Sequence, residues 1–571
     1  DKAMAFQVSP GVQVKEIDAT SVVPAVSTSI GGFAGSFNWG PCEQVVTVGS
    51  ENELAAIFGS PDGNTALYFL TAASFLKYGN ALKVVRAASG HKNATADSAG
   101  LLIKNDDDYV NNSYNTGAGS VGQWAAKFPG ILGNSLKVET VTADITDSNF
   151  NSWAYKGQFD GKPGTSDYAT NLGKGASFND EVHVIVIDED GLITGTANTV
   201  LETFSFMSIG SDAKANDGTS NYYVDVINAG SNYIRWMDHN TSLLSAGSAI
   251  SGLSSLSGTI TAVDSDSLAG GTDDNAPTTG EIATAYDLLE DSETVDVNLL
   301  FACPDANGAN TIANDLISIA AARKDCMAFV SPPIADSQGS STPAADVTAF
   351  AATLTSSSYA SCDSGALYVY DKYNDVYRYI GAAGHVAGLC ANTDSVADAW
   401  FSPAGVNRGQ LLGVTKLAYN PKQADRDTLY KARVNPIVSL PGQGTILFGD
   451  KTLLSKPSAF DRINVRRLFT TLEKAISTAA KAQLFEFNDE FTRAQFKNLV
   501  EPFLRDVKGR RGLTDFLVVC DSTNNTSQVI DGNEFVADIF VKPARSINFI
   551  TLNFVATRTG VAFTEIAGTS A

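Results

Sequence analysis

The sequence predicts a multi-domain protein that combines α/β and α+β architecture. With 571 residues, the chain is several times the size that one hydrophobic core usually serves. A strand pattern at 297–302, a helix pattern at about 311–323 and a strand pattern at 326–330 follow one another, which is the order of a parallel βαβ unit. The block 91–180 is rich in Asn, Asp, Gly, Ser and Thr, and a strong strand pattern returns at 181. We therefore expect this block to be a loop-rich insertion on the outside of an α/β domain.

The N-terminal segment has the alternation of a β-strand. Its even positions are apolar and the positions between them polar from residue 6 to residue 15, apart from an interruption at Pro10-Gly11. Because Pro is confined to the edges of sheets, we expect this segment to pair with a distant strand, in its own chain or in another.

The last third has the most regular pattern. It predicts helices at about 458–485 and 489–507, and strands at 513–520, 535–541 and 547–556. The last strand is apolar on both faces and should be covered on both sides. Uncovered strands of this kind aggregate, so proteins either cover them or use them for pairing between chains. The sequence leaves open whether the two chain ends complete their own sheet or a neighbour's.

The first of these helices carries a basic face. At 100° per residue its apolar positions fall in one arc, and the opposite arc holds Arg462, Arg466, Arg467, Lys474 and Lys481. The chain as a whole is acidic, with 40 Lys and Arg against 62 Asp and Glu and a formal net charge of −22. A basic strip on such a protein suggests contact with an acidic partner, and an ordinary solvated helix face is the alternative.

Composition argues against several classes of function. The negative net charge disfavours binding of nucleic acid by the bulk surface, and the sequence has no apolar run near the ~20 residues that span a membrane. Six Cys and four His show no metal-ligand spacing. The segment 117–122 matches a dinucleotide-binding motif by letter but follows no strand, and no nucleophile motif or phosphate loop is present. We expect a non-enzymatic protein without a catalytic site, cofactor or metal.

Several segments resemble, in order, the contractile tail sheath proteins of bacteriophages. The most specific is 400–409 (WFSPAGVNRG), and the others include 9–18 (SPGVQVKEID), 128–136 (FPGILGNSL) and 444–449 (GTILFG). Each motif alone is weak, but their shared order over most of the chain makes an accidental match improbable. The length and the large insertion resemble the large, multi-domain sheaths of myoviruses.

This resemblance implies a domain organisation. It implies an N-terminal linker arm at 1–20 that joins a C-terminal assembly domain at 361–571, next to the tail tube. It implies a discontinuous middle α/β domain at 21–90 and 181–360, and an outer β-rich insertion at 91–180. The arms would add strands to neighbouring subunits, and the residues expected to do so are Val8, Val12, Val14, Ile17, Phe549, Ile550, Leu552 and Phe554.

The resemblance also implies a function and partners. It implies a structural subunit of the virion tail, assembled in the host cytoplasm into stacked hexameric rings that contract during genome delivery. Expected partners are further copies of the chain, the inner tail tube protein, and baseplate and tail terminator proteins, with no direct contact to nucleic acid and no membrane insertion. The basic helix is expected to face the tube.

Two other functions are compatible with parts of the sequence. A surface-layer or adhesin-like protein would suit the acidic, Ser/Thr/Asn-rich composition, but it would call for internal repeats, which the sequence does not show. A hydrolase hidden in the βαβ region would need converging catalytic groups, which cannot be assembled from the residues.

Overall fold

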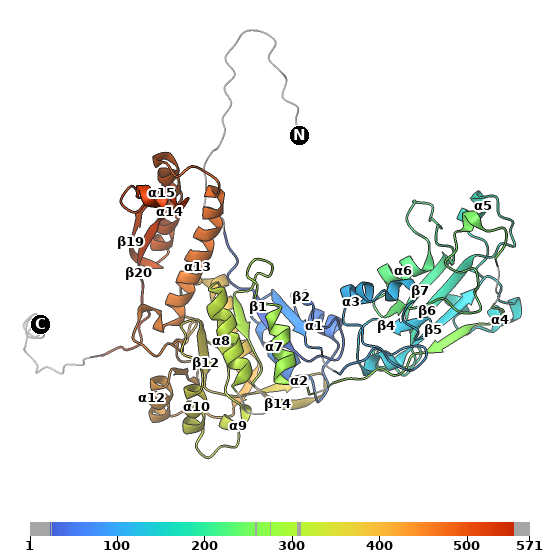
Figure 1. Cartoon of the computed structure of the whole chain (residues 1–571). Helices are drawn as coiled ribbons and strands as arrows, with labels where there is room; N and C mark the ends of the chain where they lie inside the picture. Colours follow the sequence, from blue (N-terminus) through green and yellow to red (C-terminus); the bar gives the residue numbers. More distant parts are fainter. Residues whose placement is uncertain are drawn as a thin grey trace, which may run out of the picture.

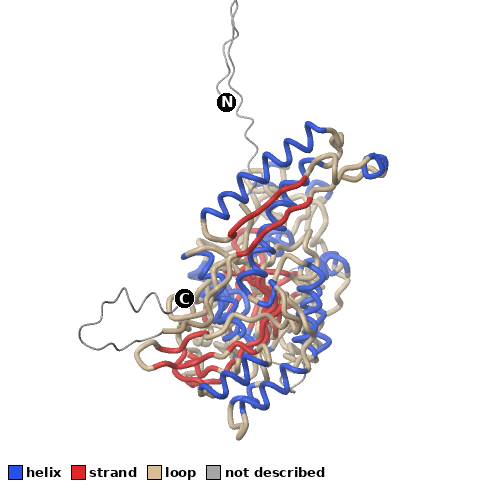
Figure 2. The backbone as a smooth tube through the Cα atoms, turned by 90° about the vertical axis from the view of Figure 1, so that its left-hand side faces the viewer, coloured by secondary structure: helices blue, strands red, loops and turns tan. Residues whose placement is uncertain are grey.

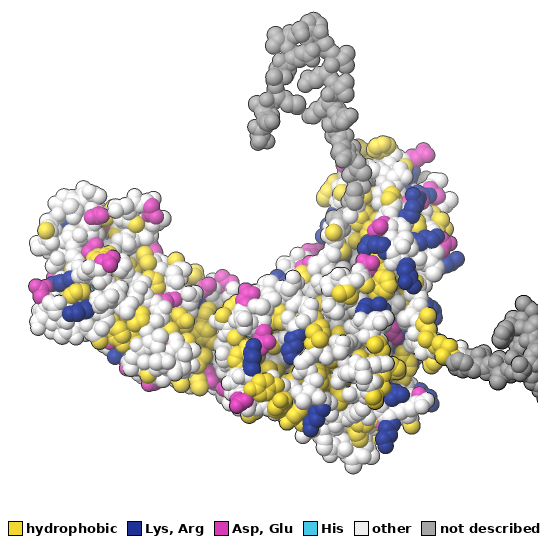
Figure 3. Space-filling model, turned by 180° about the vertical axis from the view of Figure 1, so that it is seen from behind, with side chains coloured by type: hydrophobic (Ala, Val, Ile, Leu, Met, Phe, Trp, Pro, Cys, Tyr) yellow, Lys and Arg dark blue, Asp and Glu magenta, His cyan; other side chains and the backbone are white. Residues whose placement is uncertain are grey.

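The computed structural model describes residues 23, 25–88, 90–256, 260–274, 276–304 and 310–552 (Figure 1). The predicted N-terminal arm at 1–20 lies outside these residues. A central body built on a mostly parallel sheet lies between an insertion domain and a C-terminal module. From behind, the insertion domain and the C-terminal module rise at opposite ends of the central body, and the surface between them is concave (Figure 3).

The central body is built on a sheet of seven strands. All neighbouring pairs are parallel except β2 with β3. In spatial order the strands are β16 (Val434–Asn435), β12 (Ala360–Asp363), β11 (Met327–Val330), β10 (Leu299–Phe301), β1 (Gly31–Gly35), β3 (Leu82–Arg86) and β2 (Val45–Val48). The predicted βαβ unit is confirmed, because α8 (Thr311–Arg323) connects the parallel strands β10 and β11.

Helices cover both faces of this sheet, which gives three layers. On one face lie α7 (Thr279–Asp287), α8 and α10 (Pro343–Ala352), and on the other α2 (Ala66–Leu76) and α11 (Ala383–Val396). Strand β10 shows why its sequence is apolar throughout: Leu299 and Phe301 pack into one core and Leu300 into the other. Gly384 allows the close approach of α11 to α2, because a Cβ there would lie 2.3 Å from the Ser74 hydroxyl.

Smaller elements complete the body. They are α1 (Glu51–Phe58), α9 (Ile334–Ser337), α12 (Gln423–Lys431), the antiparallel sheet of β14 (Val376–Ile380), β13 (Leu367–Asp371) and β15 (Val414–Leu417), and the hairpin β17 (Ile437–Leu440) with β18 (Gly444–Leu447). The predicted boundary at 360 is therefore wrong. Strands β12 and β16 and helix α11 all come after or across it, yet they belong to the central sheet and its cover.

The insertion domain has its own antiparallel sheet, β7 (Thr199–Ser208), β6 (Glu181–Asp188), β5 (Leu136–Thr142) and β9 (Asp264–Ser267). Around it lie the pair β4 (Trp124–Ala126) with β8 (Ile234–Trp236), and α3 (Asp106–Asn111), α4 (Asp147–Ser152), α5 (Asp167–Asn171) and α6 (Tyr223–Gly230). The predicted boundary at 180 is wrong because β6 pairs with β5 along its length. The insertion therefore continues through β9, and the chain re-enters the central body at α7.

The C-terminal module consists of two long helices and a hairpin. They are α13 (Ile463–Ala480), α14 (Glu490–Gly509), β19 (Leu513–Val519) and β20 (Asp538–Pro543), with the short α15 (Ser527–Asp531) between the strands. Leu468, Phe496 and Val518 are among the buried residues that join these helices to the hairpin. Figure 2 shows the hairpin at the surface, beside a long helix. The strand predicted at 547–556 is not found in its described part, because residues 547–552 belong to no strand.

Candidate functional site

The N-terminal segment enters the described structure at the C-terminal module. Val23 is buried against Ala475, Ala479 and Leu499 of α13 and α14, with Val26 beside it. The segment then runs along α13 and becomes β1 of the central sheet. Residues 23 and 25–30 therefore join the module to the body, and we call this segment the N-terminal root.

A buried ion pair holds this root. Nη2 of Arg467 lies 2.7 Å from each carboxylate oxygen of Asp394 on α11, and the two side chains are only 4% and 9% exposed. The Thr28 hydroxyl donates a hydrogen bond of 2.7 Å to the same carboxylate, and Arg467 donates one of 3.2 Å to the Thr28 carbonyl. Burial alone would lower the pKa of Arg467, but the adjacent Asp394 carboxylate raises it above its ordinary value. The guanidinium therefore stays charged.

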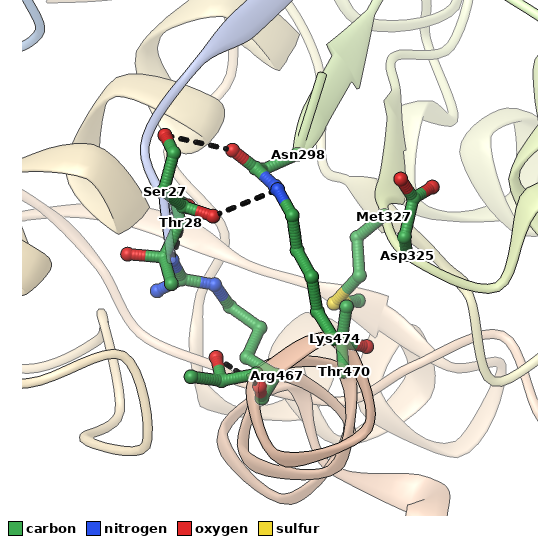
Figure 4. A pocket seen from close by; sticks show the side chains of 9 residues that line it. Ser27, Thr28, Asn298, Asp325, Met327, Arg467, Thr470 and Lys474 are labelled. Atoms are coloured by element: carbon green, nitrogen blue, oxygen red, sulfur yellow. Dashed lines mark hydrogen bonds between the residues drawn. The ribbon is translucent and has the colours of Figure 1, made fainter. Parts of the chain in front are cut away.

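A second set of contacts lies two turns further along α13. Lys474 donates a hydrogen bond of 3.0 Å to the Ser27 carbonyl and forms an ion pair with Asp296. Ile30 donates its backbone N–H to Asn298 Oδ1 at 3.3 Å and accepts one from Asn298 at 2.8 Å. Figure 4 shows Arg467 and Lys474 reaching from α13 toward Ser27 and Thr28. The root is thus bonded to both the module and the body.

The cleft at this junction and a second cleft in the central body are both too small for a substrate. The cleft lined by Ser27, Asn298, Met327 and Lys474 among others encloses about 20 Å³, and a cleft beside Cys303 and Tyr286 encloses about 50 Å³. Such volumes hold a water molecule or two, whereas small-molecule sites usually enclose hundreds of cubic ångströms. Within the described residues no group of His, Cys, Asp and Glu is arranged to hold a metal ion, and no helix is long and apolar enough to cross a membrane.

The predicted basic face of α13 is not one exposed strip. Arg466 and Arg467 are buried, each with a relative exposure of 4%. The guanidinium of Arg466 lies 4.3 Å from the ring centre of Tyr359 and 4.5 Å from that of Phe460, and it pairs with Glu473. Periodicity assigned these residues to the side away from the module's core, but that side is covered by the central body. The prediction of an exposed face is therefore wrong for Arg466 and Arg467.

The other three basic residues differ from one another. Lys474 is half-buried against the N-terminal root. Arg462 donates a hydrogen bond of 2.9 Å to the Tyr430 hydroxyl. Lys481 is exposed at the end of the helix. The sequence offers no local signal for the ion pair between Arg467 and Asp394, because the two residues are 73 positions apart.

The C-terminal segment has a root of its own. The Ser546 hydroxyl donates a hydrogen bond of 2.8 Å to Asp450, and the Asn548 side chain donates one of 2.7 Å to the Tyr430 hydroxyl. The residues around these contacts are exposed: Phe549 by 86%, Ile550 by 77% and Leu552 by 70%. Of the residues predicted to form intersubunit arms, Val8, Val12, Val14, Ile17 and Phe554 lie outside the described residues.

The hairpin β19–β20 is the element that sequence reasoning did not single out. Within the described residues it is a sheet of two strands only, so each strand has an outer edge without a partner strand. Leu517 and Phe540 face each other across its outer surface and are 56% and 59% exposed. Two-stranded sheets are marginally stable by themselves, and open edges accept further strands.

Three family models match this chain. They are described as the N-terminal region of domain III of the tail sheath protein Gp18 (residues 28–87), the phage tail sheath protein central domain (276–453) and the phage tail sheath C-terminal domain (455–557). The tail sheath proteins of Enterobacteria phage T4 and Vibrio phage KVP40 are each 34% identical to this chain, with 98% of this chain and 99% of each relative covered.

Solved structures share the fold at lower identity. The sheath tail protein from Listeria innocua has a TM-score of 0.53 at 12% identity, with 91% of this chain and 96% of that chain covered. A sheath complex of an extracellular contractile injection system, in the contracted state, has a TM-score of 0.51 at 12% identity, with 97% and 99% covered. Both likenesses support a multi-domain fold of mixed helix and strand.

Proposed function

This chain belongs to the phage tail sheath family, and we propose that it polymerises as stacked hexameric rings around an inner tail tube and contracts to drive that tube through the host envelope. Family members are structural proteins of the virion tail, so neither an adhesin nor a hydrolase is needed to explain the chain. Its proposed partners are further copies of itself, the tube, baseplate and tail terminator proteins. Assembly would take place in the host cytoplasm.

The observation that carries the proposal is that both chain ends are held at their roots beside an incomplete sheet. The N-terminal root is bonded through Thr28 and the C-terminal root through Ser546 and Asn548. Among the residues that the structure describes, the hairpin β19–β20 offers two open edges. Each arm would leave its own subunit and add a strand to the hairpin of a neighbour. Because every subunit both gives arms and accepts them, the contact is heterologous and can propagate along a helix.

The N-terminal root explains how such a connection would carry force. A charged pair buried to this degree, with further hydrogen bonds to the segment, resists local opening. Subunits would then rotate and move outward as nearly rigid bodies during contraction. The backbone hydrogen bonds of the arm to the neighbour would persist during this movement. The energy would come from larger contacts in the contracted state, released from a kinetically trapped extended state, with no nucleotide hydrolysis and no catalytic role for this chain.

The test is deletion of the N-terminal arm outside its root. A variant that lacks residues 1–18 keeps residues 23–30 and the contacts of Arg467. We expect it to fold with an unchanged thermal midpoint but to form no striated tubes in negative-stain micrographs. Full-length protein under the same conditions is the control. Normal tubes from the truncated variant would refute the role of the arm.

A further inference from the structure

Four exposed large apolar residues follow one another closely in sequence at the connection between α13 and α14, at one end of the C-terminal module. Leu484, Phe485, Phe487 and Phe491 have relative exposures of 64%, 104%, 83% and 75%. We call these four residues the aromatic tip. Single exposed apolar residues are common on proteins, but a contiguous group of large ones marks an interaction surface.

The tip is held in place by its own chain. Asn488 donates a hydrogen bond of 2.8 Å to the Glu534 carbonyl and accepts one of 2.9 Å from Arg493. Asp489 accepts the Thr492 N–H at 2.8 Å and so caps α14. Phe485 has a φ of +70°, a conformation that is unfavourable for a bulky residue and persists only where the surroundings impose it. The backbone that carries the aromatic side chains is thus held in place by the rest of the module.

The charge around the tip is mostly negative. Glu486 and Glu490 lie between and beside the exposed rings, and Asp531 and Glu534 lie on the segment that contacts Asn488. None of these four acids forms an ion pair with another described residue. The nearest basic residues in sequence are Arg493, which donates its hydrogen bond to Asn488, and Lys481, so the acids outnumber the cations by four to two. A second copy of the tip is therefore a poor partner, because like charges would face each other.

The opposite end of the module has the complementary character. The first pair of the hairpin joins Leu513 to Pro543, so Arg511 and Arg545 flank one end of it, with Lys542 next to them. These three cations are exposed and form no ion pair within the described residues. On the same outer face as Lys542 lie the exposed Leu517 and Phe540, and also Asp515, which lies opposite Lys542 and pairs with Lys508. We call the three cations together with Leu517 and Phe540 the receiving surface. Figure 3 shows several Lys and Arg side chains on the side of the C-terminal module that is seen from behind.

We propose that the aromatic tip of one subunit docks on the receiving surface of a second copy, as a head-to-tail contact between C-terminal modules. Within one chain the tip and the three cations of the receiving surface lie at opposite ends of α14, whose 20 residues span about 30 Å, so they cannot meet. A contact between two different patches of identical subunits is heterologous and extends into rings or helices. The contact uses the face of the hairpin and leaves its two edges available for strands. This inference rests on the proposed function because it presumes a homopolymer. It adds the identity of the surfaces through which the C-terminal modules would bind each other.

The experiment exchanges charges in the full-length chain. Its readout is the lowest protein concentration at which polymers sediment in the absence of the inner tube protein; we call these tube-free polymers. The tip variant Glu486→Lys/Glu490→Lys and the receiver variant Arg511→Glu/Lys542→Glu should each raise that concentration about tenfold or more, because two attractive pairs become repulsive. The chain with all four substitutions should polymerise within about threefold of the unaltered protein, since each contact regains opposite charges. The control Glu290→Lys/Glu293→Lys has the same charge change at exposed positions of the central body and should have no effect.

Apolar docking is tested separately by Phe485→Ser/Phe487→Ser. These rings are almost fully exposed, so the variant should keep the thermal midpoint of the unaltered protein and yet fail to polymerise. If the chain with all four substitutions does not regain polymerisation, the proposed pairing is overturned. Tip variants that form normal tube-free polymers but fail to assemble on the inner tube would assign the tip to the tube protein and would also overturn it. Both outcomes differ from failure of the proposed function, in which the unaltered chain itself forms no tubes.

Discussion

The central body and the C-terminal module differ in how completely they bury their own apolar side chains. In the body, strands such as β10 are buried on both faces and helices cover the sheet on each side. In the described residues, eleven of the twenty-four exposed large hydrophobic side chains lie between Leu484 and Leu552, in the module and the segment after it. The body thus covers both faces of its central sheet with its own helices, whereas the module needs neighbours to cover its apolar surface.

The largest expected effect comes from breaking the joint between the two regions. Arg467→Ala leaves the buried Asp394 carboxylate without its cationic partner and with only the Thr28 hydroxyl as a donor, which should lower the free energy of unfolding by about 3–5 kcal/mol. Lys508→Ala removes an exposed pair with Asp515 and should cost less than about 1 kcal/mol. Urea titrations followed by fluorescence measure both. Arg467→Met combined with Asp394→Leu should cost less than Arg467→Ala, and equal losses would contradict the role of the unpaired charge.

Matched truncations sharpen the comparison. Leu300→Ala removes a fully buried side chain of the body and should lower the free energy of unfolding by about 2–5 kcal/mol. Phe487→Ala removes a side chain that is 83% exposed and should change stability by less than about 0.5 kcal/mol while it reduces polymerisation. Calorimetry and sedimentation separate the two effects. A large loss of stability from Phe487→Ala would show that the module is complete without neighbours.

The buried His385 makes a contribution to the stability of the body that acid removes, whereas the buried Asp363, whose pKa burial raises to about 7, contributes in the opposite direction. Burial lowers the pKa of His385, whose ring accepts or donates a hydrogen bond of 2.9 Å with the Tyr78 hydroxyl, to about 3. Between pH 6.5 and that value the unfolded chain binds a proton at this residue that the folded chain does not, so stability falls as pH falls, by about 1.4 kcal/mol per pH unit. The exposed acids of the module, such as Asp489 and Asp521, have pKa values below their ordinary range because of hydrogen bonds and contribute only at lower pH.

The variant His385→Gln isolates this effect. It removes the titrating ring and should flatten the dependence of the body's thermal midpoint on pH between 6.5 and 4, whatever it does to absolute stability. Calorimetric scans at several pH values measure it. An unchanged slope would mean that other groups control the acid response.

The sequence predicted the fold class and the βαβ unit because both depend on local pattern. The strand, helix and strand at β10, α8 and β11 are read from neighbouring residues and are found in that order. The resemblance of ordered motifs to tail sheath proteins is confirmed by the family matches and by relatives that cover nearly the whole chain.

Domain boundaries failed where strand pairing is non-local. The change in composition at residue 180 marks a buried strand, β6, and a buried strand has the same composition in either domain. Its partner β5 also pairs with β9, in which Asp264 lies opposite Thr140. No local pattern reports a pairing over such a separation. Sequence alone therefore ended the insertion too early.

The basic helix failed for a related reason. Periodicity shows which residues of α13 share a face, but not what covers that face. Arg467 and Arg466 meet Asp394 and Tyr359, which come from distant parts of the chain. The sequence did not reveal the exposed tip because its apolar residues follow the helix period, and only their exposure in the folded chain separates them from a core.

The most direct test of this account is a helical reconstruction of the assembled polymer at a resolution that traces strands. We predict that β19 and β20 carry additional strands on their outer edges, contributed by arms whose roots lie on neighbouring subunits. A hairpin that stays two-stranded in the polymer, or one completed by its own chain, would contradict the account.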